Sequence, residues 1–316
     1  MRPFRFGVIG ERVGDGTALI ETAGAAEAAG YATFLLRDDL VAAPFGPQPA
    51  PLAALATVAA ATTTLRIGTM VLANDFRHPA VLAKEAATLD LLSGGRFELG
   101  IGAGWLREEY ARAGIPFDPV GVRIDRLEES LRVLKGLLGG GAFSFSGLHY
   151  AVDGLENFPA PVQRPRPPLL VGGGGKRMLG IAAREADVVG VMGSSVASGT
   201  LASDPAALGP ERIAEKVGWV REAAGERFAE IELSLVASVA VAAHRRQAAE
   251  RFAAERGWGG VGADEVLAMP TVLVGPVDAI VEDLEARRER YGFSYVAVED
   301  AELAAFAPVV ARLAGR

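Results

Sequence analysis

The sequence predicts an α/β protein whose strands close into a (β/α)8 TIM barrel, with insertion segments over the barrel mouth. Three observations lead to this fold class. Short apolar runs are typical of parallel strands buried on both faces, and stretches with helical spacing separate these runs. The alternation recurs about eight times, which is the count of such a barrel. The length of 316 residues exceeds the roughly 250 that the barrel needs, so insertions can be accommodated.

Residues 66–105 show the repeating unit most clearly. Residues 67–72 form a short apolar run, and Pro79 can occupy the first turn of the helix that follows. Apolar residues then recur every three or four positions up to Leu92, so one face of this helix can lie on the sheet. A strand beginning at Phe97 runs into residues 100–105, GIGAGW, where absent side chains allow a ligand or another backbone to approach.

The other predicted elements follow the same alternation. Further strands are expected at residues 4–9, 33–36, 169–171, 188–192, 231–241 and 295–298, and further helices at residues 19–29, 52–62, 124–138, 178–185, 213–224, 247–255 and 277–291, with another starting at residue 107. We interpret residues 1–316 as a single domain with insertions near residues 139–168 and 193–210. A small hairpin is expected around Ser146-Gly147. Residues 193–209 are rich in Ser, Gly and Ala, which predicts a mobile loop.

Composition limits the classes of function. Hydrophobic residues make up 50% and charged residues 22%, so a sizeable core is expected. A net charge of -7 argues against nucleic acid as the partner. With no cysteine and only three widely separated histidines, we expect no metal site. No apolar run reaches the roughly 18–20 residues of a membrane span and the start lacks a signal peptide, so we expect a cytoplasmic protein without a membrane partner.

A run of glycines lies between a predicted strand and a predicted helix: Gly172, Gly173, Gly174 and Gly175. Bare backbone N–H groups and the positive end of the helix would face an anion there, and Lys176 adds charge. The alternative is a tight connection without a ligand. A Walker loop is excluded, because Leu170 stands where that motif requires Gly and Arg177 where it requires Ser or Thr.

Asp38 and Asp39 come where a predicted strand ends, which is the catalytic end of a parallel barrel. Neighbouring residues of an extended chain point in opposite directions, so one aspartate can face the mouth while the other caps a turn or pairs with a basic residue. A solvated turn is the alternative for both. Asp39 could work as an acid or base if burial raised its pKa from about 4 toward neutrality.

Residues 66–105 resemble the luciferase-like monooxygenase family, whose pattern is HPA or NPA, an AxxxATLDxLSxGR helix and a GxGxGW turn. The resemblance extends to GYATFLLRDDL, PPLLVGGGGKRMLGIAAREAD and VLVGPVDAIVEDLEARRERYGFSYVAV, so it covers most of the chain. Within the family the chain looks most like the branch that uses the deazaflavin coenzyme F420. The resemblance implies that the glycine turn, with Lys176, holds the cofactor phosphate.

The resemblance also implies roles for residues near the cofactor ring. Met70-Val71 aligns with a non-proline cis peptide that forms a bulge behind the ring, whereas an ordinary strand would be trans here. Ala73 follows near the carbonyl edge of the ring. The family has Ser-Asp-His, with the histidine as proton donor or acceptor, where this chain has Arg37-Asp38-Asp39. Asp39 is therefore the candidate for the histidine's catalytic role, and Asp38 for cofactor binding.

Trp105 and Glu108 stand where the F420 enzymes place an acidic residue and an asparagine. Trp105, the second catalytic candidate, either forms an apolar wall of the site or packs under its loop. Glu108 either contacts the polyol of the cofactor or caps its helix. Without the acidic residue, a sugar phosphate is a poor substrate candidate.

These features predict an F420-dependent oxidoreductase that moves a hydride between the deazaflavin and a small organic substrate. One alternative is a two-component monooxygenase that receives reduced FMN from a reductase partner. Another is a barrel that binds a flavin or small ligand without catalysis. The resemblance also implies a homodimer, formed through helices beside the second and third barrel units.

Overall fold

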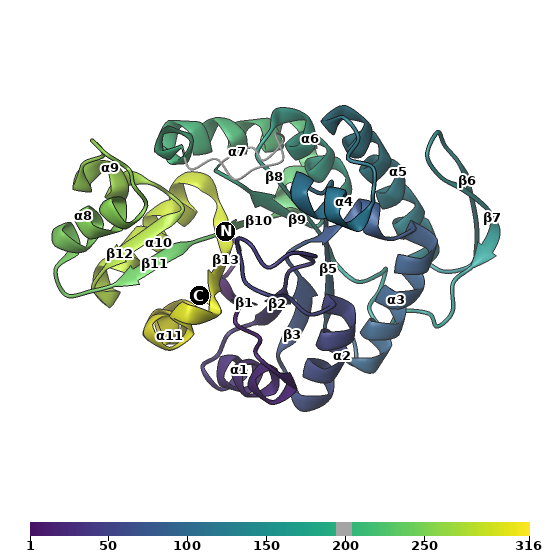
Figure 1. Cartoon of the computed structure of the whole chain (residues 1–316), viewed down its shortest axis with the longest axis horizontal. Coiled ribbons are helices and arrows are strands. Elements are labelled where there is room, and N and C mark those ends of the chain that lie inside the picture. Colours follow the sequence, from purple (N-terminus) through teal and green to yellow (C-terminus); the bar gives the residue numbers. More distant parts are fainter. Residues whose placement is uncertain (194–203) are drawn as a thin grey trace.

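Within residues 1–193 and 204–316, which this computed structural model describes, eight parallel strands close a barrel. Their order is β3-β2-β1-β13-β10-β9-β8-β5, and β3 pairs with β5 to complete the ring. The predicted TIM barrel is confirmed (Figure 1). The strands are β1 (Arg5–Gly10), β2 (Thr33–Leu36), β3 (Arg66–Thr69), β5 (Phe97–Gly102), β8 (Leu169–Gly173), β9 (Val188–Val191), β10 (Glu232–Val236) and β13 (Phe293–Glu299).

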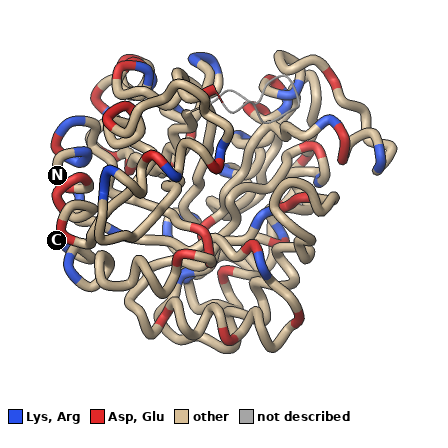
Figure 2. The backbone as a smooth tube through the Cα atoms, turned by 60° about the vertical axis from the view of Figure 1, so that its left-hand side comes forward, with Lys and Arg blue, Asp and Glu red and all other residues tan. Residues whose placement is uncertain are grey.

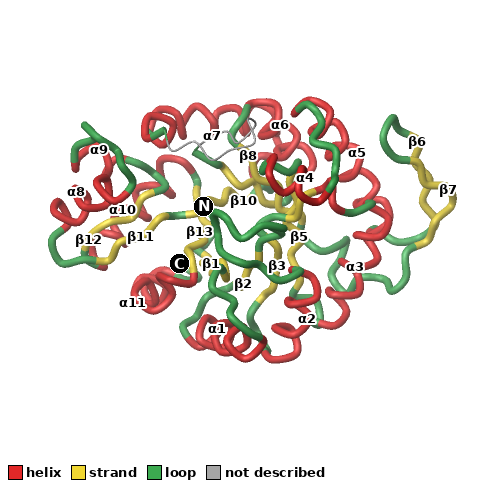
Figure 3. The backbone as a smooth tube through the Cα atoms, in the orientation of Figure 1, coloured by secondary structure: helices red, strands yellow, loops and turns green. Residues whose placement is uncertain are grey.

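Helices surround the strands (Figure 3). Alternate strand residues enter two separate apolar clusters, as the period of two requires: Val8 and Leu36 join the large core under the helices, while Ile9 and Leu35 join a smaller cluster with Tyr295. The smaller cluster fills the barrel interior. The covering helices are α1 (Gly16–Ala28), α2 (Pro51–Ala61), α3 (Pro79–Leu92), α5 (Val120–Leu138), α6 (Lys176–Glu185), α7 (Pro210–Ala224), α10 (Val277–Tyr291) and α11 (Leu303–Leu313).

The predicted hairpin is confirmed as β6 (Ala142–Ser146) paired antiparallel with β7 (Ala151–Glu156). It lies beside α3 and α5 at one end of the molecule (Figure 1). Glu129 of α5 accepts hydrogen bonds from the backbone N–H groups of Leu148, His149 and Tyr150, at 2.7, 2.8 and 3.1 Å. This carboxylate therefore attaches the hairpin turn to the barrel.

The expected strand at residues 231–241 is two strands in the structure. Ala237 donates its N–H to Ala297 of β13 at 2.8 Å, whereas Ser238 donates to Thr271 at 2.9 Å, so the hydrogen-bonding partner changes there. Beyond this point β11 (Ser238–Val241) pairs with β12 (Val272–Gly275) outside the barrel. With α8 (Arg245–Glu255) and α9 (Ala263–Ala268) they form what we call the lobe, residues 238–275, which has its own apolar core.

The remaining elements are short. They include β4 (Leu72–Ala73), α4 (Arg107–Ala113) and several 3-10 turns, one of them at Pro205–Leu208. The predicted mobile loop at residues 193–209 falls largely on residues 194–203, outside the described part of the chain. No helix in the described ranges has the length and apolar character needed to cross a membrane. Basic and acidic positions are interspersed along the chain (Figure 2).

Candidate active site

Asp38 lies in the mouth formed by the carboxyl ends of the parallel strands. Its two oxygens accept hydrogen bonds from the Arg77 guanidinium at 2.5 and 2.9 Å, and Oδ2 also accepts the N–H of Ala73 at 3.1 Å. Burial raises the pKa of Asp38, and Arg77 opposes that shift. One aspartate of the predicted pair thus binds a basic residue, and it holds Ala73 of β4 against the end of β2.

Asp39 has a different set of neighbours. The Trp105 side chain lies beside its carboxylate and lowers its pKa, and the Trp105 ring centroid lies 6.1 Å from that of Phe45. Arg37 covers Phe45 at 3.8 Å and donates to Glu11 at 2.7 Å. Burial raises the pKa of Asp39, Asp38 raises it further, and Arg37 and Trp105 lower it. The structure therefore brings the two catalytic candidates, Asp39 and Trp105, close together.

The Met70–Val71 peptide bond is cis. Ile67 of β3 lies opposite Phe97 of β5, and Leu72 of β4 lies opposite Ile101 of β5. The chain therefore advances five residues from Ile67 to Leu72 while β5 advances only four. This mismatch is a β-bulge. Met70 and Val71 pack against the cluster inside the barrel.

Glycines of β5 make room for the bulge. A Cβ at Gly100 would lie 1.9 Å from the carbonyl oxygen of Thr69, and one at Gly102 would lie 2.9 Å from Cγ2 of Val71. The Thr69 hydroxyl donates to the Gly100 carbonyl at 2.7 Å and accepts the Gly100 N–H at 2.9 Å. The absent side chains in GIGAGW thus allow the approach of another backbone, one of the two uses predicted for them.

The loop between β5 and α4 is held in place by the side chains of Tyr110 and Arg123. Gly104 has a φ of +72°, and a Cβ there would lie 1.8 Å from the Tyr110 hydroxyl. Tyr110 donates to Asp75 at 3.1 Å, and Arg123 donates to the Gly104 carbonyl at 2.6 Å. These contacts fix the direction in which Trp105 and α4 leave the barrel.

The glycine turn joins β8 to α6, as predicted. Gly175 is the N-cap of α6 and provides no side-chain hydrogen bond, so the first N–H groups of the helix have no cap. A Cβ at Gly175 would meet nothing within 4 Å, and one at Gly172 would come no closer than 3.7 Å to another atom. In contrast, Gly173 packs against Met178. With respect to the described residues, the space beside the turn is therefore open at Gly175, whereas Gly172 is in ordinary contact with the Gly190 carbonyl.

The two lysines near the glycine turn differ in exposure. Lys176 is exposed and lies 3.5 Å from Glu222 of α7. Lys216, which the sequence analysis did not select, is buried, and its ammonium donates to the carbonyls of Met192, at 2.8 Å, and Gly193. Met192 in turn donates its N–H to Gly173 at 2.9 Å. Burial lowers the pKa of Lys216, whose charge lies next to the turn.

The two glutamates at the start of α4 have opposite surroundings. Glu108 is exposed and pairs with Arg112 at 2.6 Å, whereas Glu109 is 2% exposed and accepts the N–H of Leu40 at 2.9 Å. Burial and the charges of Asp39 and Asp38 raise the pKa of Glu109 to about 7. The sequence had pointed to Glu108. Both glutamates lie in the first turn of α4, and Trp105 precedes the helix cap, so no local spacing distinguishes Glu109.

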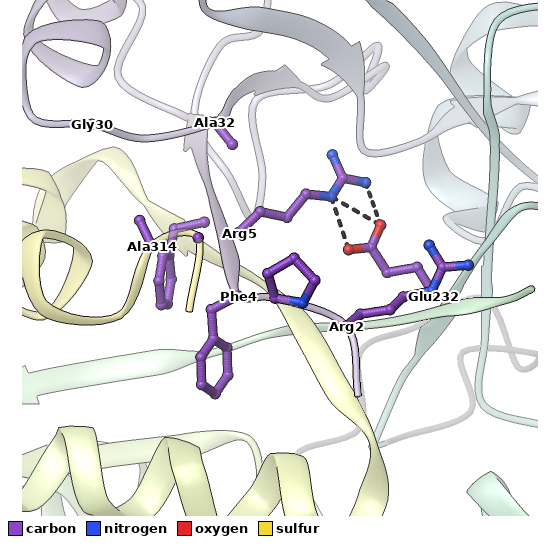
Figure 4. A pocket seen from close by; sticks show the side chains of 10 residues that line it. Arg2, Phe4, Arg5, Gly30, Ala32, Glu232 and Ala314 are labelled. Atoms are coloured by element: carbon purple, nitrogen blue, oxygen red, sulfur yellow. Dashed lines mark hydrogen bonds and ion pairs between the residues drawn. The ribbon is translucent and has the colours of Figure 1, made fainter. Parts of the chain in front are cut away.

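A pocket of about 450 Å³ lies at the opposite end of the barrel (Figure 4). Arg5 and Glu232 line it, and they are bonded to each other at 2.9 Å. Arg5 also donates to the buried Glu98 at 2.6 Å. The charges are thus paired among themselves, and this end of a barrel usually serves stability rather than chemistry. No group of three or more acidic or histidine side chains that could hold a metal occurs in the residues described.

Known proteins resemble the chain in sequence and in fold. It is 34% identical to an FMNH(2)-dependent dimethylsulfone monooxygenase of Pseudomonas putida over 137 residues, 43% of this chain and 38% of that protein. It is 36% identical to an F420-dependent glucose-6-phosphate dehydrogenase of Amycolatopsis mediterranei over 130 residues, 41% of this chain and 39% of that protein. The chain spans less than two thirds of the length of the curated relatives it matches.

A solved structure has the same fold over nearly the whole chain. The coenzyme F420-dependent tetrahydromethanopterin reductase of Methanopyrus kandleri superposes with a TM-score of 0.76 at 19% identity, covering 98% of this chain and 99% of that one. The sequence pattern of the luciferase-like monooxygenase family matches residues 3–309. The chain therefore belongs to the luciferase-like monooxygenase family, among whose enzymes are F420-dependent and FMNH(2)-dependent oxidoreductases.

Proposed function

We propose that this protein is a cytoplasmic F420-dependent oxidoreductase that transfers a hydride between the deazaflavin and a small organic substrate. The observation that carries the proposal is one barrel mouth that combines the apolar bulge at Met70 and Val71 with an uncapped helix start at Gly175. A planar ring can pack on the bulge, and an anionic tail can bind at the helix start. Deazaflavin has both parts.

The residues present fit such a cofactor. Oδ1 of Asn74, next to Ala73, is buried and has no hydrogen-bond partner in the described part of the chain, so it can accept a hydrogen bond from a polar ring edge. Among the described residues, the open space at Gly175 leaves room for a phosphate against bare N–H groups. Lys216 adds a buried positive charge beside that turn. Glu108 and Lys176, both exposed, remain candidates only for the outer parts of the cofactor.

When bound, the deazaflavin supplies the hydride chemistry. The residues of the chain bind and orient the cofactor and transfer the substrate proton. Val71 offers an apolar surface to the ring, and Asp38 keeps Ala73 in place beside it. Asp39 takes or gives the substrate proton, with Trp105 holding its carboxylate.

A second candidate is an FMN-dependent monooxygenase supplied by a reductase partner. The sequence identity to the FMNH(2)-dependent relative supports it, because 34% over 137 residues is close to the 36% over 130 residues for the F420-dependent one. A barrel that binds its ligand without catalysis is the third candidate, supported by Asp39 standing where the family has a histidine. Oxygen consumption with reduced FMN distinguishes the monooxygenase from the first candidate. Tight cofactor binding without turnover distinguishes the non-catalytic barrel.

Fluorescence titration of the purified protein with deazaflavin and, separately, with FMN tests the proposal. We expect micromolar or tighter binding of deazaflavin only, lost in Gly174→Asp because a carboxylate would occupy the anion's place. Gly16→Asp, which puts the same side chain at the exposed start of α1, is the matched control and keeps binding. Preference for FMN supports the monooxygenase, and binding of neither rejects both cofactor assignments.

We also propose a homodimer formed through α2 and α3. On α3, Leu91 and Leu92 are 49% and 63% exposed, which is unusual for adjacent leucines on a helix. Light scattering should show a dimer that Leu92→Glu converts to monomer. Leu148→Glu, at the exposed hairpin turn, should leave the dimer intact, and a monomeric wild-type protein would reject the proposal.

A further inference from the structure

The segment after β2 is attached to the start of α4 at two points. Trp105, just before the helix, lies beside the Asp39 carboxylate and lowers its pKa. Glu109, in the first turn of the helix, accepts the backbone N–H of Leu40 at 2.9 Å through Oε2. The position of Asp39 in the mouth therefore depends on the start of this helix.

Glu109 is a buried carboxyl group without a cationic partner among the described residues. It is 2% exposed and takes part in no ion pair of the structure as described. The charged groups facing it after β2 are Asp38 and Asp39.

The nearby cations are already engaged. Arg77 binds Asp38, and Arg37 binds Glu11. On α4 itself, Arg112 pairs with Glu108, away from the mouth. Among the residues described, no cation of these elements neutralises Glu109, so its ionisation puts a second negative charge next to that of Asp39.

We propose that Glu109 is a positioning residue that acts through Asp39: it holds Asp39 against Trp105 and controls, by its own charge, how strongly Asp39 binds a proton. While Glu109 is protonated, Asp39 carries the only charge of the two. Once Glu109 ionises, repulsion raises the proton affinity of Asp39, which makes it the stronger base. The catalytic use of Asp39 rests on the proposed function, but the coupling of the two carboxyls does not.

The indole N–H of Trp105 lies beside the Asp39 carboxylate, so its NMR signal reports the ionisation of that group. The coupling can therefore be tested without cofactor or substrate. The chain has three tryptophans, so a ¹⁵N–¹H spectrum contains three indole signals, and Trp105→Phe identifies the one needed. In the wild type we expect this signal to move in two steps with pH, the upper one near pH 7, where Glu109 titrates.

Glu109→Gln keeps an oxygen for the Leu40 N–H but removes the charge. We expect it to abolish the upper step while the lower step remains. Glu109→Asp, which keeps the charge, should retain an upper step, and Glu21→Gln, on the exposed face of α1, should change neither. Circular dichroism at each pH checks that every variant is folded.

An upper step that persists in folded Glu109→Gln, or its absence from the wild type, overturns the inference. The two proposals fail separately. Failure to bind deazaflavin or FMN rejects the proposed function and leaves the titration unaffected. Tight deazaflavin binding together with a single-step titration rejects only the role of Glu109.

Discussion

Asp38 and Arg77 form a two-point ion pair that joins the end of β2 to the segment before α3, with oxygen–nitrogen distances of 2.5 and 2.9 Å. The Asp38 side chain is 5% exposed and that of Arg77 is 22% exposed. The same carboxylate holds Ala73, so one residue supports both the bulge and the strand next to it.

Asp38→Asn should lower the free energy of unfolding by about 2–3 kcal/mol, since it leaves a largely buried arginine without its counter-charge. Urea denaturation measures the change. The control is Arg312→Gln, which breaks the exposed pair with Asp278 and should cost less than about 0.5 kcal/mol. Equal costs for the two variants would show that the buried pair does not stabilise the fold.

Gly104→Ala should destabilise the protein by about 1–3 kcal/mol, because the added methyl group would overlap the Tyr110 hydroxyl at a position with positive φ. Tyr110→Phe removes that hydroxyl, so the double variant should cost less than the sum of the single ones. Gly24→Ala, inside α1 with open space around it, should instead stabilise slightly. Strict additivity at residues 104 and 110 would contradict the predicted overlap.

Glu27 should make stability depend on pH in the acid range. Hydrogen bonds from Thr64, Leu65 and Thr63 lower the pKa of its carboxyl from 4.5 to about 2. The unfolded chain therefore binds this proton first as pH falls, so stability present above about pH 4.5 is lost on the way down to pH 2.

Thermal unfolding at a series of pH values measures this effect. Glu27→Ala should lose about 1 kcal/mol at pH 7, a discounted value because solvent screens this partly exposed group. Below about pH 2 the variant and the wild type should be nearly equal in stability. A constant difference across the range would mean that the carboxylate charge is not involved.

Glu98→Gln should reduce stability without changing deazaflavin binding. Glu98 accepts hydrogen bonds from Arg5 at 2.6 Å and Arg66 at 2.5 Å at the end of the barrel opposite the mouth. Removing its charge leaves two arginines with less compensation, at a cost of about 3 kcal/mol in the free energy of unfolding. An unchanged dissociation constant, measured at a temperature where both proteins are folded, would confirm the separation of the two ends.

Local signals were sufficient to predict much of the barrel. Thr33–Leu36 was predicted to the residue, because a β-branched and apolar run lies between Gly30 and Asp38. Helix Val277–Tyr291 was also predicted to the residue, since Pro276 precedes it and Gly292 ends it with a φ of +87°. In both cases the decisive residues lie within a few positions of the element.

The lobe and Glu109 depend on distant contacts. The apolar run that forms β10 and β11 has no break in its pattern, and only the arrival of β12, more than 30 residues later, takes β11 out of the barrel. Glu108 and Glu109 are the same residue type, and the tertiary contact of Tyr110 with Asp75 decides which one faces inward. The helix could therefore be predicted from the sequence, whereas the inward-facing glutamate could not, and the exposed Glu108 was chosen in its place.

The separate core of the lobe has a dynamic consequence. Phe252, Trp258 and Val266 pack with one another rather than with the main core under the barrel helices. Regions with their own small core open more readily than the unit to which they are attached. Hydrogen exchange should therefore show two levels of amide protection. The amides of α8 and α9 should exchange through local opening of the lobe, whereas those of β1 and β13 should exchange only when the whole barrel unfolds.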